Sequence, residues 1–215
     1  MRPAEKLTAG PVRNLSTLEW GVGGHVALDF ANTVGDIRSG QPKPFLHSYE
    51  DLLEWCQRED LIGPNSWRYL SAGSTQAKAA AYRESQLLNA SLRALFGAAA
   101  RHEPLPQTAM DHLNSLVQKT AAWRHISTED DDGRKVSCGW NFKGATPIGL
   151  LGPIVWRAVE LLEHGELQRV KECPPPDGCG WLYLDTSKNR SRQWCSMKTC
   201  GNTAKVRRFR NRNKG

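Results

Sequence analysis

The sequence predicts an α+β fold: a mostly helical N-terminal domain with a small β-hairpin, plus a small C-terminal cysteine-rich module made of a short hairpin and one helix. Three observations predict this arrangement. Apolar side chains recur near the 3.6-residue helical period in several stretches before residue 165. Residues 123–140 change to a period of two. Four of the six cysteines lie between positions 173 and 200. We therefore place the two domains at residues 1–165 and 166–215.

The N-terminal segment begins with residues 1–16, which we expect to form a loose tail. Residues 26–30 then alternate larger and smaller side chains, so we expect a strand-to-helix transition there. Asp29, Asn32 and Thr33 are polar residues inside this apolar stretch. They either form internal turn and capping hydrogen bonds or line a small-molecule pocket, and we name them as candidate effector-binding residues.

Capping signals mark the helices that follow. Ser48, with Asp51 three residues later, opens a helix that is expected to run to about Glu59. A short helical turn is expected to start at Asn65 or Ser66.

The longest predicted helix is rich in alanine and runs from about residue 74 to residue 101. Thr108 is expected to cap the next helix, because an acid follows three residues later. The last helix of this domain is expected to begin at Thr146, which precedes a proline, and to end near Gly165. Pro153 should kink this helix or mark its real beginning, because proline lacks the N–H that an interior position donates.

Residues 123–140 predict a β-hairpin. Two segments of alternating character, 123–127 and 134–140, flank an Asp-Gly pair that is typical of a tight turn. The turn holds four consecutive acids, residues 129–132. A calcium loop needs alternating ligands and a following glutamate, so we interpret these acids as a solvated turn.

The cysteines of the C-terminal module (residues 166–215) follow the spacing C-x5-C-x15-C-x4-C. Two close pairs joined by a hairpin-sized loop can bring four thiolates to one tetrahedral zinc ion. Gly180 and Gly201 follow the second cysteine of each pair and allow the backbone to bend toward the sulfur.

Two disulfides or four unrelated thiols are the alternatives to a metal site. The N-terminus lacks the apolar core of an export signal, so we expect a cytoplasmic protein with reduced thiols. We therefore predict one structural Zn²⁺ ion held by Cys173, Cys179, Cys195 and Cys200.

The remainder of the module is expected to be a strand, a loop and a helix. Residues 181–184 predict the strand, residues 185–194 a polar loop, and residues from Ser196 to about Arg212 the helix. Val206 and Phe209 fall on one stripe of this helix, which we expect to pack on the small core of the module.

The positive charge of the chain is concentrated in this module. The whole chain has a formal net charge of +7. Residues 165–215 contain 12 Lys and Arg against 4 Asp and Glu, a net charge of +8, so the preceding residues carry −1. A basic module beside a near-neutral domain is typical of nucleic-acid binding. No apolar run reaches the roughly 18 residues that a membrane span needs.

The module resembles the CGNR zinc finger. The resemblance rests on residues 194–197, on Cys200-Gly201-Asn202, on the basic residues between 205 and 210, and on the upstream run 185–192. Thr203 departs from the family pattern, in which an arginine is the fourth letter of CGNR. No role of that arginine is carried over to this chain.

Residues 28–33, LDFANT, are similar to the hallmark L-D-[LF]-x-N-T of the ABATE domain. That domain precedes such fingers in bacterial proteins described as stress-induced transcription regulators. The two resemblances cover nearly the whole chain. They imply a DNA-binding regulator whose N-terminal domain senses a small-molecule effector or forms a homodimer.

The primary hypothesis is therefore a regulator that binds double-stranded DNA. The alternative is an RNA-binding or protein-interaction module, with Trp181, Tyr183 and Trp194 stacking on unpaired bases. We expect no catalysis, because the six histidines are scattered and a four-cysteine zinc ion has no open position for water. The residues predicted to contact DNA phosphates are Lys188, Arg190, Arg192, Lys205, Arg207, Arg208, Arg210 and Arg212.

Overall fold

The structure is a computed structural model that describes residues 21–35, 37, 41–128, 132, 134–175 and 178–212. The tail predicted for residues 1–16 lies outside this part, and so do residues 129–131 of the predicted acidic turn. No helix in the described part is long and apolar enough to cross a membrane.

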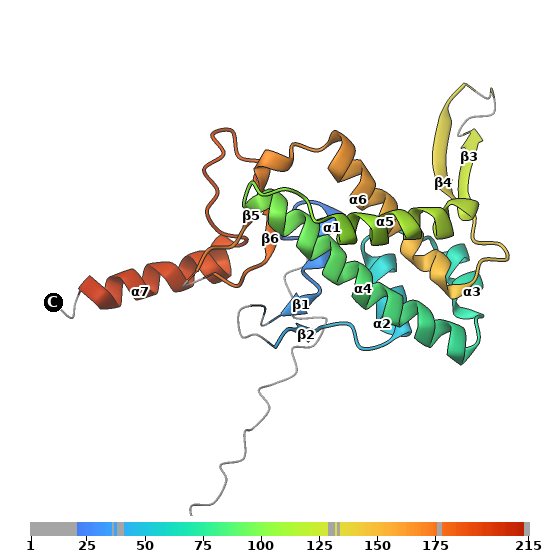
Figure 1. Ribbon diagram of the computed structural model, residues 1–215, viewed down its shortest axis with the longest axis horizontal. Helices are drawn as coiled ribbons and strands as arrows, with labels where there is room; N and C mark the ends of the chain where they lie inside the picture. Colours follow the sequence, from blue (N-terminus) through green and yellow to red (C-terminus); the bar gives the residue numbers. More distant parts are fainter. Residues whose placement is uncertain are drawn as a thin grey trace, which may run out of the picture.

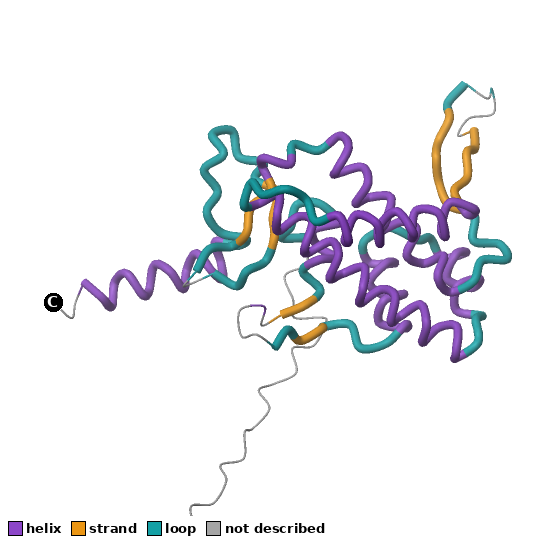
Figure 2. Tube along the Cα trace, in the orientation of Figure 1, coloured by secondary structure: helices purple, strands orange, loops and turns teal. Residues whose placement is uncertain are grey.

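The fold class predicted from the sequence is confirmed. Helices dominate, and the strands in the described ranges form three separate two-stranded antiparallel pairs (Figure 2). The helix α7 projects from one end of the molecule and the hairpin β3–β4 from the other (Figure 1). The helices are α1 (Val26–Ala31), α2 (Tyr49–Arg58), α3 (Pro64–Ser71), α4 (Thr75–Ala100), α5 (Gln107–Thr120), α6 (Gly152–His164) and α7 (Asn202–Arg212). The strand pairs are β1 (Val34–Gly35) with β2 (Lys43–Pro44), β3 (Arg124–Thr128) with β4 (Val136–Trp140), and β5 (Val170–Glu172) with β6 (Leu182–Leu184).

The long helix α4 forms the centre of the N-terminal domain (residues before 166), which we call the body. Its residues Leu88, Leu92, Leu95 and Phe96 recur at the helical period and are fully buried. The helices α1, α2 and α5 and the strand β5 all contact α4. The 3.6-residue period that predicted this helix therefore identified the central element of the core.

The cap predicted at Ser48 is confirmed, and the cap predicted at Thr108 is wrong. The Oγ atom of Ser48 accepts a hydrogen bond from the backbone N–H of Asp51 at 3.1 Å, and Ser74 caps α4 in the same way. Thr108 does not cap α5, which begins one residue before it and has Pro106 at the N-cap. The ring of Pro106 presets an extended entry, and its carbonyl accepts the first helical hydrogen bond.

The strand-to-helix transition expected around residues 26–30 is also wrong. Residues 26–31 form one short helix, α1, and no strand precedes it in the described residues. Residues 27–31 are all buried, because α1 is covered by α4, α6 and β6. A helix that is buried on every side has no polar face, so its sequence shows no helical period.

The last helix of the body begins where its proline indicates. A 3₁₀ turn, η4 (Pro147–Leu151), follows Thr146, and α6 starts at Gly152 with Pro153 in its first turn. Pro153 thus marks the beginning of the α-helix, one of the two outcomes expected for it.

The first part of the C-terminal module packs into the body. Val170 on β5 and Leu182 on β6 are 1% and 2% exposed and belong to the same apolar core as α4. The hairpin β5–β6 contacts both α1 and α4. A second, smaller core, which we call the cysteine core, lies next to this hairpin. In it Tyr183 and Trp194 pack with Cys173, Cys195 and Cys200.

Candidate metal centre and basic helix

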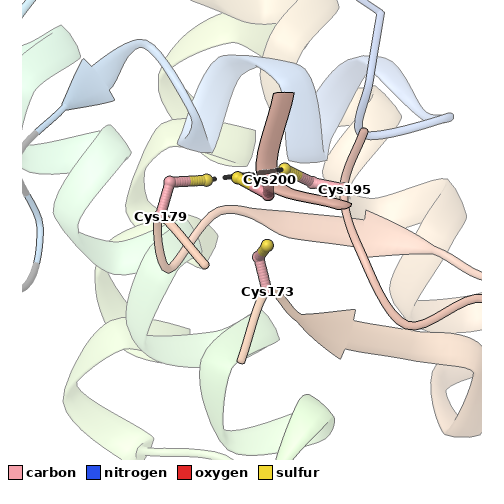
Figure 3. Close-up of side chains that lie close together, drawn as sticks. All are labelled: Cys173, Cys179, Cys195 and Cys200. Carbon is pink, nitrogen blue, oxygen red and sulfur yellow. Dashed lines mark hydrogen bonds between the residues drawn. The ribbon is translucent and has the colours of Figure 1, made fainter. Parts of the chain in front are cut away.

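Four sulfur atoms meet at the end of the hairpin β5–β6. Cys173 follows β5, Cys179 lies before β6, and Cys195 and Cys200 come from the segment that leads into α7 (Figure 3). Their Sγ atoms all lie within 4.8 Å of one another, and the pair Cys195–Cys200 is separated by 3.8 Å. With a Zn–S distance of about 2.3 Å, neighbouring sulfurs of a tetrahedral site are about 3.8 Å apart. The donor set and its spacing therefore fit one structural zinc ion.

Glycines allow the backbone to approach these sulfurs. A side chain at Gly178 would place its Cβ 2.7 Å from the Sγ atom of Cys173, which is closer than van der Waals contact permits. Gly180 adopts a φ of +80°, a conformation that other residues rarely tolerate. Backbone N–H groups then face the sulfurs: those of Cys179 and Cys195 donate to Cys173.

The crowding of the thiols shifts their pKa values in opposite directions. Hydrogen bonds from the thiols of Cys179 and Cys195 lower the pKa of Cys173. The same contacts, together with burial, raise the pKa of Cys195. Four thiolates at this spacing repel one another unless a cation lies between them, and a bound Zn²⁺ ion supplies that charge while it keeps all four deprotonated.

A buried carboxylate organises the loop between β6 and the third cysteine. The side chain of Asp185 is fully buried, and its two oxygens accept hydrogen bonds from Lys171 and from the hydroxyl and backbone N–H of Ser187. Burial alone would raise the pKa of Asp185, but these donors outweigh it and hold that pKa well below its usual value. Lys171 could not be recognised from the sequence as a partner of Asp185. A lysine inside a short strand near a polar loop is too weak a pattern to reveal a buried ion pair.

Arg192, predicted to contact phosphate, is used inside the protein instead. Its guanidinium lies 4.5 Å from the ring centroid of Tyr183 and donates to the backbone carbonyls of Val22, Leu184, Trp194 and Cys195. A planar group with five donors suits several carbonyls at once. With these donors engaged, Arg192 connects the segment around Cys195 to Val22 of the body, and its charge is not presented to a partner.

The polar residues of the LDFANT segment hold the C-terminal module. The Asn32 side chain donates to the carbonyl of Leu182 at 2.8 Å and accepts from its N–H at 2.9 Å. Asp29 accepts from the N–H of Gly23 at 2.8 Å, and the carbonyl of Gly23 accepts from Leu184 at 2.7 Å. Asp29 and Asn32 thus make internal hydrogen bonds, which was the first of the two roles considered for them.

Thr33, the third residue of that set, is bonded internally and also lines a cavity. Its hydroxyl donates to the carbonyl of Phe30 and accepts from Asn89. Thr33 also lines a cavity between α1, the strands β1 and β2, and α4. Of the three candidate effector-binding residues, Thr33 lines this cavity, and Asp29 and Asn32 do not.

The other predicted phosphate contacts lie at the surface. Arg190 adopts a φ of +51° and pairs with Glu166 at 3.2 Å. Lys188 is exposed on the loop beside it. The five cations of α7 are exposed as well: Lys205, Arg207, Arg208, Arg210 and Arg212.

The apolar stripe of the last helix does not pack as expected. Val206 is 40% exposed and Phe209 is 61% exposed, whereas Ala204 is the buried residue of α7. Only the first turn of α7 touches the cysteine core, and the remainder extends away from the body (Figure 1). The expectation that Val206 and Phe209 cover the core of the module is therefore wrong.

The aromatic residues considered for base stacking are engaged in packing. Tyr183 and Trp194 are 1% and 8% exposed. The Nε1 atom of Trp181 donates to the carbonyl of Val34 at 3.0 Å, and its ring packs edge-on against Phe45. Tyr183 and Trp194 are therefore packed inside the module, and Trp181 is half-buried against the body.

Comparison with known families accounts for both parts of the chain. Residues 24–165 match the model of ABATE, described as "Putative stress-induced transcription regulator". Residues 169–213 match the model of the CGNR zinc finger. No curated protein matches the chain.

Proposed function

Because the chain belongs to the ABATE family and carries a CGNR zinc finger, we propose that it is a transcription regulator that binds double-stranded DNA through its C-terminal module. In this proposal the zinc ion is structural. It fixes the start of α7 against the cysteine core, and no step of DNA recognition passes through the metal.

The charge of the projecting helix is the observation that carries the proposal. Residues 202–212 contain five cations and no acidic residue, and the helix extends away from the body (Figure 1). An α-helix fits the major groove of B-DNA, and cations along it can meet the flanking phosphates. The exposed Phe209 and Val206 lie among these cations, where apolar side chains can contact thymine methyl groups.

A concave surface beside this helix supports the same proposal. A cavity of about 490 Å³ lies between the 186–194 loop and α7, and its lining includes Lys205 and Arg208. Lys188 lies on the same loop and is exposed. Phosphates of one DNA strand could contact this surface while α7 enters the groove.

The first test is selection of genomic DNA fragments on the zinc-loaded protein at about 150 mM salt, where non-specific phosphate binding is weakened. We expect enrichment of a few fragments that share a sequence motif. Uniform recovery of the genome, or no recovery, would contradict a sequence-specific regulator.

The salt dependence of binding tests the role of α7. If about five of its cations meet phosphates, the slope of log K against log salt should be near −4.5. A triple variant, Lys205→Gln with Arg208→Gln and Arg210→Gln, should make this slope shallower by about 2 to 3. The matched control removes three exposed cations from the body: Arg68→Gln, Arg83→Gln and Lys143→Gln. Equal slopes in both variants would mean that net charge alone, and not α7, sets the affinity.

Two further parts of the proposal concern the body. We propose that it senses a small-molecule effector or forms a homodimer, which would allow a palindromic operator to be read. Sedimentation of the zinc-loaded chain with and without operator DNA tests the dimer. We also propose that the protein is not an enzyme, since four cysteine ligands leave a zinc ion no position for a reacting water.

A further inference from the structure

A cavity of about 360 Å³ lies beside the LDFANT segment. One wall is a single face of α4, and the others come from α1 and from the strands β1 and β2. Small-molecule sites in proteins have volumes of roughly 300–1,000 Å³, so this cavity is large enough for a compact ligand.

Most of the wall is apolar. Phe30, Val34, Pro44 and Leu46 supply carbon surface, and Ala90 lies exposed at the rim. An apolar wall with a few polar groups is typical of a site that binds the carbon body of a ligand by burial and orients it by hydrogen bonds.

Arg93 is the one charged residue among the described residues that line the cavity. Its Nη1 atom makes a long contact of 3.5 Å with the carbonyl of Ala31, and no carboxylate of the described part lies within ion-pair distance of it. Burial lowers the pKa of Arg93, which reflects the partial loss of hydration of its charge. The charges of Glu172 and Cys179 act on this guanidinium as well and favour its charged form. A half-buried guanidinium that makes one long hydrogen bond gains from a ligand carboxylate, which it can hold through two parallel hydrogen bonds.

Asn89 provides a second polar group on the same wall. It is 5% exposed, and its Nδ2 atom donates to the carbonyl of Phe30 at 2.7 Å and to the Thr33 hydroxyl at 3.0 Å. These bonds fix the orientation of the amide, yet its Oδ1 atom accepts no hydrogen bond from the described residues. Asn89 and Arg93 are one helical turn apart, so their side chains lie on one face of α4.

We propose that this cavity binds a small carboxylic acid that has a ring-sized apolar body and a hydroxyl group. The carboxylate pairs with Arg93, the hydroxyl donates to the Oδ1 atom of Asn89, and the apolar body packs against the wall that includes Phe30 and Val34. A neutral analogue of the acid loses the ion pair, and an analogue without the hydroxyl leaves the Asn89 acceptor unpaired.

The cavity also adjoins the attachment of the C-terminal module. Val34 lines it, and the carbonyl of Val34 accepts the hydrogen bond from Trp181. Thr33 and Val34 directly follow Asn32, which holds Leu182. A ligand in the cavity therefore contacts the segment that positions the module. The regulatory consequence rests on the proposed function, whereas binding of the acid does not.

Isothermal titration calorimetry on the full-length, zinc-loaded chain tests the site. The probes are 3- and 4-hydroxybenzoate, with benzoate and 4-hydroxybenzamide as matched analogues. We expect saturable binding of at least one hydroxybenzoate at one site per chain, with the Kd of the matched amide at least tenfold weaker. Arg93→Gln should weaken hydroxybenzoate at least tenfold and leave the weak amide binding unchanged. Ala90→Trp should block the rim and abolish binding of every probe.

Arg83→Gln is the control, because Arg83 is exposed on the same helix and does not line the cavity. It should bind the acids as the unaltered chain does, and thermal unfolding of each variant shows that the fold is retained. The proposal is overturned if no probe binds, or if Arg93→Gln and Ala90→Trp bind as tightly as the control. If the chain binds DNA but none of the probes, the ligand site is contradicted and the proposed function stands. If a probe binds in this cavity but no sequence-specific DNA binding is found, the ligand site stands and the proposed function is contradicted.

Discussion

The side chain of Asn32 pairs with the backbone of Leu182 as a neighbouring strand would. It makes one donor and one acceptor bond, at 2.8 and 2.9 Å, to a residue 150 positions away. β5 occupies one edge of β6, and Asn32 together with Gly23 covers the other. The outer edge of β6 is thus closed by the end of a helix and a turn of the body, which leaves that edge unavailable for pairing with another chain.

Replacement of Asn32 should therefore destabilise the whole protein. Asn32→Ala leaves a buried N–H and a buried carbonyl on Leu182 without partners, each at a cost of about 1–3 kcal/mol. We expect the free energy of unfolding, measured in urea, to fall by about 2–5 kcal/mol. Asn114→Ala, at an exposed position of α5, should change it by less than about 0.5 kcal/mol. Equal effects of the two variants would contradict the role given to Asn32.

Zinc should bind with a stoichiometry of one per chain. Cys200→Ser should lower the measured zinc content and melt the start of α7, because a small module depends on its metal for folding. The helices of the body should persist, since α4 and its neighbours have an apolar core of their own. Metal analysis and far-ultraviolet circular dichroism measure both effects. Cys138→Ser, an exposed cysteine outside the cluster, should retain full zinc content, and a loss there would argue against the assigned ligands.

The stability of the protein should depend on the ionisation of Asp29. Burial raises the pKa of Asp29 to about 6, so the folded state holds the proton more tightly than the unfolded chain, in which the pKa is about 3.9. Stability from this group is fully present below pH 4 and is lost as the pH rises through 6, by about 3 kcal/mol at most. Asp29→Asn should remove this decline from the plot of unfolding free energy against pH. An identical plot for both proteins would show that Asp29 titrates normally.

Arg192 and Arg210 should separate stability from DNA binding. Arg192→Gln removes donors to four backbone carbonyls and the contact with Tyr183, so we expect a lower melting temperature. Arg210→Gln, on the exposed part of α7, should leave the melting temperature unchanged and weaken DNA binding. The reverse pattern would assign the phosphate contact to Arg192.

Phe209 should contribute little to folding. It is 61% exposed on α7, so Phe209→Ser should change the free energy of unfolding by less than about 0.5 kcal/mol. If Phe209 contacts DNA, the same variant should weaken binding to the selected operator more than binding to unrelated DNA. A loss of several kcal/mol in stability would restore the packing role that the helical stripe predicted.

Local signals predicted most of the fold because local physics decides those elements. The cap at Ser48, the period of α4 and the proline of α6 each act within a few residues, and the structure agrees with them. The cysteine spacing likewise identified four sulfurs that converge.

The failures arise where contacts distant in sequence decide the outcome. α1 shows no helical period because elements from three other parts of the chain bury it. Arg192 resembles any exposed arginine of a polar loop, and only the folded chain shows the carbonyls of Val22 and Leu184 around it. Phe209 has the right spacing for a core residue, but α7 leaves the body before that position.

The hairpin β5–β6 also decides whether the C-terminal module can exist apart from the rest of the chain. Its residues Val170 and Leu182 complete a core that begins in α1, so the boundary between the two family matches in sequence does not separate two independent cores. Cut off before residue 166, the module would lack the Asn32 and Gly23 that cover the edge of its strand β6. A zinc ion alone should therefore not be enough to fold residues 166–215 as a separate peptide.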